Sequence, residues 1–158
     1  PIDELAARLR GFAERFGVQV YLEPGDTVVT DTTSLEVSVL DIVENEKAIA
    51  IVDSAVEAHM LDLLVYRQDA AVAPNAGAHR YIIAGKSCLA GDIFGEFDFP
   101  QSLEVGSRIS LLNAGGYTMV KKNWFNGVAM PAIAIRRQNG AVELVREFGY
   151  ADYVSSLS

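Results

Sequence analysis

The run LEVSVLDIVENEKAIAIV, residues 35–52, decides the fold class of this chain. Residues 35–43 alternate between apolar and polar side chains, and residues 48–52 are apolar and rich in β-branched isoleucine and valine. Both patterns are typical of β-strands. The polar residues 44–47 between them indicate a turn. The run therefore predicts two strands joined as a hairpin.

Short runs of the same kind continue along the chain. Further strands are predicted at residues 81–84, 108–112, 117–121, 132–136 and 141–145. Gln138-Asn139-Gly140 is a strong hairpin signal between the last two. Loops are predicted at residues 69–79 and 95–106, and a short helical tail at residues 150–154. We therefore predict a mainly β fold, a Greek-key-like antiparallel β-barrel.

The amino-terminal segment has a different pattern. Residues 2–16 carry apolar side chains three or four positions apart with charged residues between them, which predicts an amphipathic helix. Gly17 lies where helices commonly end, and residues 18–22 form a short β-rich run. A lone helix and strand have no layer to pack against, so they indicate one unit of a larger α/β structure. We expect a boundary between residues 1–25 and residues 26–158.

Composition and charge limit the kinds of partner. The 158 residues are 50% hydrophobic and 22% charged, which suits one sizeable core and excludes a disordered chain. No apolar run approaches the roughly 20 residues that span a bilayer, so no membrane segment is expected. The net charge of −8 disfavours nucleic acid and favours cationic or neutral partners. One cysteine and two histidines exclude an internal disulfide, and we assign no metal site and expect a cytoplasmic location.

Several short segments carry side chains suited to chemistry. Glu23-Pro24-Gly25 places a carboxylate after a predicted strand, where α/β proteins bind ligands, although a simple turn also explains it. Cys88 lies in a glycine-flanked loop, residues 85–92, and is either a reactive thiol or a small buried residue. Residues 113–118 contain paired glycines, as phosphate-binding loops and barrel corners both do. Asp62 offers one more carboxylate.

In this order the motifs resemble the carboxy-terminal part of the decarboxylases that use pyridoxal 5′-phosphate (PLP) and have the alanine-racemase-like fold (fold type III). This group includes ornithine and diaminopimelate decarboxylases. The resemblance is carried by Glu23-Pro24-Gly25, Ser87-Cys88, Gly91-Asp92, Gly116-Tyr117-Thr118 and Phe125-Asn126-Gly127. Within the group, the chain resembles in particular the carboxynorspermidine/carboxyspermidine decarboxylases, through residues 40–45, residues 58–60 with Asp62, and residues 88–92, 117–121 and 146–150.

The resemblance implies a role for individual residues. Glu23 would face the pyridine nitrogen of PLP. Gly25 and Tyr117 would contact the PLP phosphate, through a backbone amide and a hydroxyl respectively. Cys88 would be the acid that returns a proton to the α-carbon after decarboxylation. It would act in the active site of the second protomer of a homodimer with shared active sites.

The residue after the cysteine bears on the substrate. Ornithine decarboxylases carry an acid there that holds the distal amine of the substrate, and diaminopimelate decarboxylases carry a glutamate, whereas this chain has Leu89. We therefore expect a carboxylated polyamine, carboxynorspermidine or carboxyspermidine, whose amines are held elsewhere. Asp62 is the first candidate for that contact, with Asp26 and Asp92 behind it. Near Asp62 the chain departs from the family at Leu61, where a proline is usual.

The resemblance also implies parts that this sequence lacks. In the family, the Schiff-base lysine, the histidine stacked on PLP and the main phosphate loop belong to an amino-terminal TIM barrel. Residues 1–25 would be the last helix and strand of that otherwise absent barrel, and residues 26–158 the C-terminal β-barrel domain. The fragment alone is expected to be inactive. The alternatives are another fold-type III decarboxylase, such as diaminopimelate or ornithine decarboxylase, and a non-catalytic β-barrel binding module.

Overall fold

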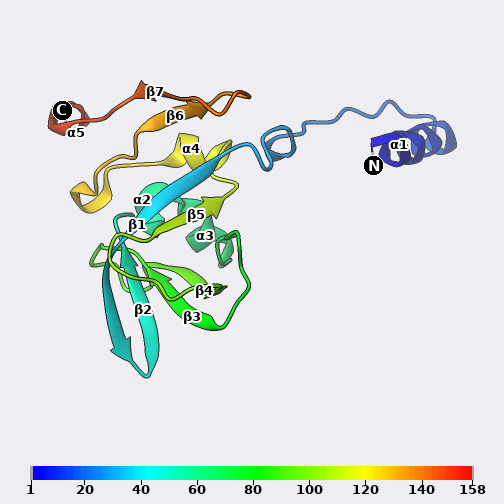
Figure 1. The fold of residues 1–158 in the computed structure, drawn as a ribbon. Helices are drawn as coiled ribbons and strands as arrows, with labels where there is room; N and C mark the ends of the chain where they lie inside the picture. The colour runs from blue at the N-terminus through cyan, green and yellow to red at the C-terminus, as the bar shows by residue number, and fades with distance from the viewer. Residues whose placement is uncertain (1, 158) are drawn as a thin grey trace.

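Seven strands, five α-helices and two 3₁₀ helices lie along residues 2–157, which are the residues that this computed structural model describes (Figure 1). The strands are β1 (Ser34–Asn45), β2 (Lys47–Val52), β3 (His79–Ala84), β4 (Ile93–Phe99), β5 (Arg108–Leu112), β6 (Ile133–Arg136) and β7 (Val142–Arg146). The helices are α1 (Ile2–Phe16), α2 (Val56–His59), α3 (Leu61–Tyr66), α4 (Tyr117–Lys121) and α5 (Tyr150–Ser155), with 3₁₀ helices η1 (Asp26–Val28) and η2 (Phe125–Gly127). Among these, none is long and apolar enough to cross a membrane.

Strands β1 to β5 form one curled sheet in the order β4-β3-β2-β1-β5. The long strand β1 pairs with β5 through residues 34–38 and with β2 through residues 39–45. Its pairing shifts by one residue between Val39 and Asp41. Such a bulge bends a strand and increases its twist. Because β1 changes partner at the bulge, the sheet curls into a half-barrel with β4 and β5 at its edges.

The predicted mainly β fold is confirmed, with one correction to its strand directions. β2 and β3 run parallel, whereas the other paired strands are antiparallel. The chain between β2 and β3 contains α2, α3 and a loop, and parallel neighbours require a crossover connection of this kind. The hairpin predicted at residues 44–47 is present, with Glu46 in the left-handed region at φ +60°.

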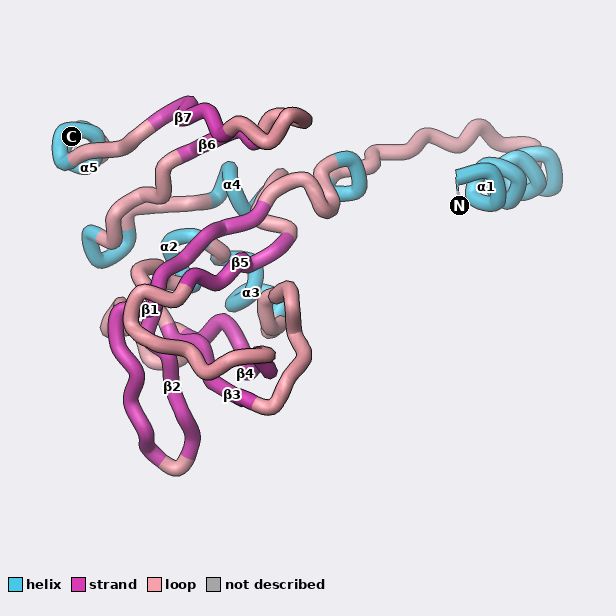
Figure 2. Tube along the Cα trace, viewed as in Figure 1, coloured by secondary structure: helices cyan, strands magenta, loops and turns pink. Residues whose placement is uncertain are grey.

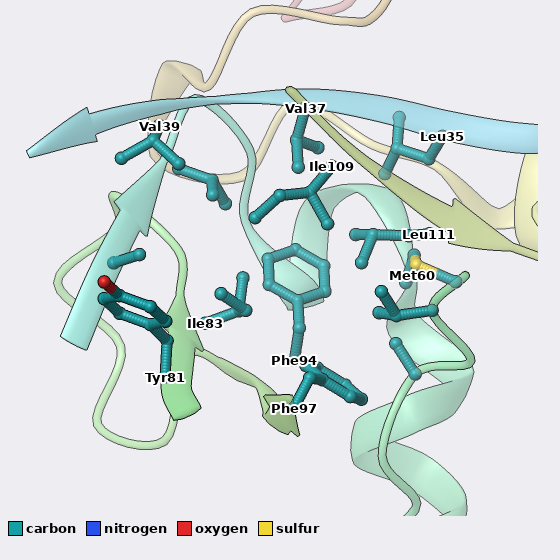
Figure 3. Packing of buried hydrophobic residues seen from close by; sticks show 14 of the residues in the cluster. Leu35, Val37, Val39, Met60, Tyr81, Ile83, Phe94, Phe97, Ile109 and Leu111 are labelled. Atoms are coloured by element: carbon teal, nitrogen blue, oxygen red, sulfur yellow. The ribbon is translucent and has the colours of Figure 1, made fainter. Parts of the chain in front are cut away.

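The hydrophobic core lies on the concave side of the sheet. Alternate residues of β1, Leu35, Val37 and Val39, point into it, as the sequence pattern predicted. Phe94 is fully buried at its centre, and Met60 closes it where α2 meets α3 (Figure 3). Other members of the cluster are Val52, Val56, Tyr81, Ile83, Phe97, Ile109 and Leu111. This packing fixes α2 against the sheet, and α2 in turn positions the candidate site.

Helix α1 lies apart from the sheet (Figures 1 and 2). None of its residues is buried, and Leu5, Phe12 and Phe16 on its apolar face are more than half exposed. Gly17 ends the helix at φ +61°, as predicted. Residues 18–22 form no strand, contrary to their β-rich pattern. A strand needs a neighbour to complete its hydrogen bonds, and no described segment pairs with this one.

Two further predictions of secondary structure are wrong. Residues 117–121 form helix α4 instead of a strand. The preceding Gly116, at φ +55° and ψ −128°, turns the chain away from a strand ladder. Residues 95–106 were predicted as a loop, but the first of them belong to β4. Gly95 lies at φ +139° within that strand, where a Cβ would stand 2.6 Å from the Phe97 ring, so this glycine permits the strand instead of ending it.

The carboxy-terminal segment packs on the chain around η2. Strands β6 and β7 pair as a separate hairpin, as Gln138-Asn139-Gly140 predicted. The Trp124 ring lies 6.2 Å from that of Phe148 and 5.7 Å from that of Tyr153, measured between ring centres. These aromatic contacts attach the predicted helical tail, now α5, to the loop that carries Asn126.

Candidate active site

Two segments far apart in the sequence meet where Tyr117 begins α4. The Tyr117 backbone N–H donates to Asp26 Oδ1 at 3.3 Å, across 91 positions of sequence. A Cβ at Gly116 would collide with the same carboxylate oxygen. A Cβ at Gly25 would stand 3.4 Å from Cε2 of the Tyr117 ring. The structure therefore brings together Gly25 and Tyr117, the two residues predicted to contact a phosphate, and places Asp26 beside them.

The groups available to a cofactor here are a hydroxyl, a carboxylate and a nearby ammonium. The Gly25 amide donates to the Glu23 carbonyl at 2.9 Å, so in this conformation the predicted backbone donor is already paired. Tyr117 is 55% exposed, which leaves its hydroxyl as a donor. Lys121 Nζ lies 4.9 Å from the centre of the tyrosine ring and adds positive charge. The Glu23 side chain is exposed close by in sequence. By their chemistry, the tyrosine hydroxyl can donate to an anion such as the phosphate of PLP, and a carboxylate such as that of Glu23 can accept from a protonated pyridine nitrogen.

Asp62 lies in the first turn of α3 and holds a lysine. Lys121 Nζ donates to Asp62 Oδ1 at 2.7 Å and to Oδ2 at 2.9 Å. The hydrogen bond to Asp62 raises the pKa of Lys121 above its usual value, so the ammonium stays charged. Lys121 thus links Asp62 to the face of the Tyr117 ring, at a cation–π distance.

A cleft of about 500 Å³ opens beside this ion pair. Asp26, Asp62 and Asp69 line it, together with Tyr66 and Thr118. Three carboxylates near one ammonium leave an excess of negative charge, which favours a cationic ligand. Two of the three residues predicted to hold substrate therefore share one cleft. Asp69 was not predicted, because no motif surrounds it in the sequence.

Cys88 is exposed on the loop between β3 and β4. The Asn126 side-chain amide donates to Cys88 Sγ at 3.2 Å, across 38 positions of sequence. Two motifs that were separate in the sequence, Ser87-Cys88 and Phe125-Asn126-Gly127, thus meet in the structure. An exposed thiol with a polar neighbour fits the reactive alternative and not the buried, apolar one.

Asp92 has a different environment from the other predicted substrate residues. It is 5% exposed, and its Oδ1 and Oδ2 accept the backbone N–H groups of Val56 at 2.7 Å and Ser87 at 2.9 Å. A Cβ at Gly85 would collide with this carboxylate, so the glycine makes room for it. The predicted contact between Asp92 and substrate therefore needs correction: these contacts favour a structural role, in which Asp92 fixes the Cys88 loop to α2.

His59 is a buried residue of α2. Its Nδ1 is 2.7 Å from the Ser54 hydroxyl, and the residue is 4% exposed. Burial, with a smaller effect of the nearby Lys86 charge, lowers the pKa of His59 to about 4. The imidazole is therefore neutral at pH 7. Among residues 2–157, no group of three or more His, Cys, Asp or Glu side chains is arranged to hold a metal ion.

We expect His59 to make stability depend on pH. Its pKa is about 4 in the folded chain and about 6.5 in an unfolded chain. As the pH falls below 6.5, the unfolded chain therefore binds a proton that the folded chain excludes. The free energy of unfolding should fall by about 1–2 kcal/mol between pH 6.5 and pH 5, and this fall should level off below pH 4, where the folded chain also binds the proton. Urea unfolding across this range measures the change.

His59→Asn keeps a polar atom near Ser54 but does not titrate, so it should remove this pH dependence. His79→Asn, at an exposed position on β3, is the matched control and should retain it. If His59→Asn loses stability with falling pH as steeply as the parent chain, another group carries the effect.

Comparison with known proteins adds independent information. Residues 17–115 match the family model described as "Pyridoxal-dependent decarboxylase, C-terminal sheet domain". Over 157 residues the chain is 63% identical to a carboxynorspermidine/carboxyspermidine decarboxylase of Herminiimonas arsenicoxydans, covering 99% of this chain and 43% of that protein. Over 145 residues it is 41% identical to a carboxyaminopropylagmatine decarboxylase of Synechocystis, covering 89% of this chain and 38% of that protein.

A solved structure has a similar arrangement of the backbone. The crystal structure of carboxynorspermidine decarboxylase from Campylobacter jejuni, complexed with norspermidine, aligns with a TM-score of 0.83 at 36% sequence identity. The alignment covers 98% of this chain and 46% of that one. The chain thus spans less than half the length of these relatives.

Proposed function

This chain belongs to the C-terminal sheet domain family of the pyridoxal-dependent decarboxylases, and from that premise we propose that it is part of an enzyme of polyamine biosynthesis. The enzyme would decarboxylate carboxynorspermidine or carboxyspermidine to norspermidine or spermidine. The observation that carries this proposal is the acidic cleft beside Asp62 and Lys121, because it suits a substrate with several ammonium groups. The 63% identity to the Herminiimonas decarboxylase supports the same substrates.

Asp62 and Asp26 are proposed to bind the ammonium groups of the substrate. Asp62 already holds one ammonium, that of Lys121, with 2.7 and 2.9 Å contacts. An ionised carboxylate has about four acceptor sites, so a second ammonium can bind without displacing the first. Asp26 lines the same cleft and would hold a second positive group of the same molecule.

The cofactor is proposed to be PLP, which supplies an acceptor for the electron pair released with carbon dioxide. The Glu23 carboxylate would hold the pyridine nitrogen protonated. The Tyr117 hydroxyl would donate to the phosphate, and Gly25, without a side chain, leaves the space beside the tyrosine ring open. The Schiff-base lysine is proposed to lie in the part of the relatives' length that this chain does not span.

Cys88 is proposed to give its thiol proton to the α-carbon of the substrate. Its exposure supports action across a subunit boundary, in a homodimer with shared active sites. The unpartnered apolar face of α1 supports the view that residues 1–25 complete a TIM barrel, with residues 26–158 as the C-terminal domain. The single cysteine is consistent with a cytoplasmic enzyme.

Carbon dioxide release tests the proposal. The full-length protein that carries this chain, loaded with PLP, should decarboxylate carboxynorspermidine or carboxyspermidine in preference to carboxyaminopropylagmatine and diaminopimelate. The 158-residue chain alone should show no turnover with PLP. A preference for diaminopimelate would identify another member of the fold group, and cofactor-loaded protein without any decarboxylation would favour a non-catalytic binding module. Turnover by the isolated chain would contradict the proposal that the Schiff-base lysine lies outside these 158 residues.

A further inference from the structure

We propose that Asn126 is a positioning residue for Cys88, and that helix α2 ties together the two loops that carry these residues. This inference rests on the proposed function for its catalytic meaning, because Cys88 matters to turnover only if it is the acid. The arrangement itself is independent of that role, since it consists of contacts within this chain.

Asn126 meets two requirements at one position. Its side-chain amide donates to Cys88 Sγ at 3.2 Å. Its backbone lies in the left-handed region, at φ +55° and ψ +17°, inside η2. Asn and Asp adopt this conformation more readily than other residues with a side chain. Asparagine therefore supplies both a side chain that tolerates this backbone conformation and an N–H donor for the sulfur.

The loop before Asn126 is attached to α2 by Asn123. The Asn123 backbone N–H donates to the Ala58 carbonyl at 2.8 Å, and its side-chain amide donates to the Glu57 carbonyl at 2.7 Å. Its side-chain oxygen accepts the Phe125 N–H at 2.8 Å, which starts the turn that presents Asn126. One asparagine thus connects the end of α2 to the residue that contacts the thiol.

The Cys88 loop is attached to the start of the same helix. Asp92 accepts the N–H of Val56, the first residue of α2, and the N–H of Ser87, the neighbour of Cys88. The Lys86 N–H donates to the Ser54 carbonyl at 2.9 Å. All four residues of α2 are buried, so the helix is held between the two loops. These hydrogen bonds connect the Cys88 loop through Asp92 to α2, and α2 through Asn123 to Asn126, which in turn contacts Cys88.

These contacts have a chemical consequence for Cys88 as a proton donor. An acid that must protonate one particular carbon needs a fixed direction, and a donor on the sulfur restricts the rotation of the thiol. Once the proton has left, the same N–H stabilises the thiolate that remains. Asn126 therefore both orients the thiol and stabilises the thiolate that remains after proton transfer.

Asn126→Asp in the PLP-loaded, full-length enzyme tests the inference. Aspartate keeps the size and the left-handed backbone but replaces the donor with a negatively charged acceptor. We expect kcat to fall about tenfold with KM unchanged, as for loss of one hydrogen bond to a charged group. Alkylation of Cys88 by iodoacetamide, followed by mass spectrometry, should slow by a similar factor, because the carboxylate opposes the reactive thiolate. Asn139→Asp, in the exposed β6–β7 turn, should change neither.

Asn123→Asp tests the attachment of the Asn126 loop to α2. It keeps the acceptor for Phe125 but removes the donor to Glu57, so kcat should fall by roughly two- to fivefold, again with KM unchanged.

Unchanged alkylation in Asn126→Asp would overturn the inferred contact, whatever the activity of the enzyme. Slower alkylation with unchanged kcat would overturn the positioning role in catalysis. Slower alkylation in a protein that decarboxylates none of the four substrates would support the contact and reject the proposed function instead.

Discussion

Cys88→Ala in the full-length, PLP-loaded enzyme should lower kcat by about 10²–10⁴-fold while the cofactor remains bound. A positioned general acid contributes rate factors of roughly this size. The thiol is exposed and contacts Asn126, and no residue proposed to hold PLP depends on it. The absorbance of bound PLP reports cofactor occupancy, and carbon dioxide release reports turnover, so the two effects separate cleanly.

Cys88→Ser distinguishes acidity from packing. Serine is nearly isosteric and retains an acceptor for the Asn126 amide, but its hydroxyl is a far weaker acid than a thiol. The serine variant should therefore lose almost as much activity as the alanine variant. Activity close to that of the parent enzyme in Cys88→Ser would show that the side chain fills space, and would remove Cys88 from the acid role.

The sheet was predictable because its signal is local. Alternation along residues 35–39 marks the side chains that point into the core, and the burial of Leu35, Val37 and Val39 follows it. The turns at residues 44–47 and 138–140 likewise depend on residues within a few positions of one another. The direction of β3 relative to β2 was not predictable in this way, because it depends on how the chain between them crosses the sheet.

Helix α4 shows where local propensity fails. Tyr117, Thr118 and Val120 favour strands. In the structure, Gly116 turns the chain and the Asp26 carboxylate accepts the first N–H of the helix. That carboxylate lies 91 positions away. Long-range contacts of this kind override weak propensities, and no pattern within five residues reveals them.

The sequence singled out the motifs of the candidate site but not the contacts between their side chains. The sequence singled out Cys88 and Asp62, yet their partners Asn126 and Lys121 come from segments that the fold brings close. Asp92 was predicted as a further substrate contact, behind Asp62 and Asp26, because a carboxylate can pair with an ammonium group. Its burial under two backbone amides is a tertiary property that the sequence does not encode locally.

Asp62→Asn should raise the KM for the carboxylated polyamine by about 10–100-fold and leave kcat within a fewfold of the parent value. A hydrogen bond to a charged group contributes about 1.5–3 kcal/mol, which corresponds to this range. The Asp62 side chain is 19% exposed, so water screens the interaction only in part. Steady-state kinetics on the full-length enzyme measures KM and kcat together. Asp98→Asn is the matched control, because Asp98 is also ion-paired, with Arg80, but does not line the cleft.

The ion pair with Lys121 provides a second control, since Asp62→Asn alters the pair as well as the carboxylate. Lys121→Met breaks the same pair but keeps the negative charge of Asp62 in the cleft. If the carboxylate itself binds the substrate ammonium, Lys121→Met should leave KM unchanged or lower it, because a competing cation is gone. A KM raised equally by both variants would mean that the intact pair, acting through the position of α3 and Tyr117, matters instead. Asp62 would then be a structural residue, and Asp26 and Asp69 would remain as the carboxylates of the cleft that face the substrate.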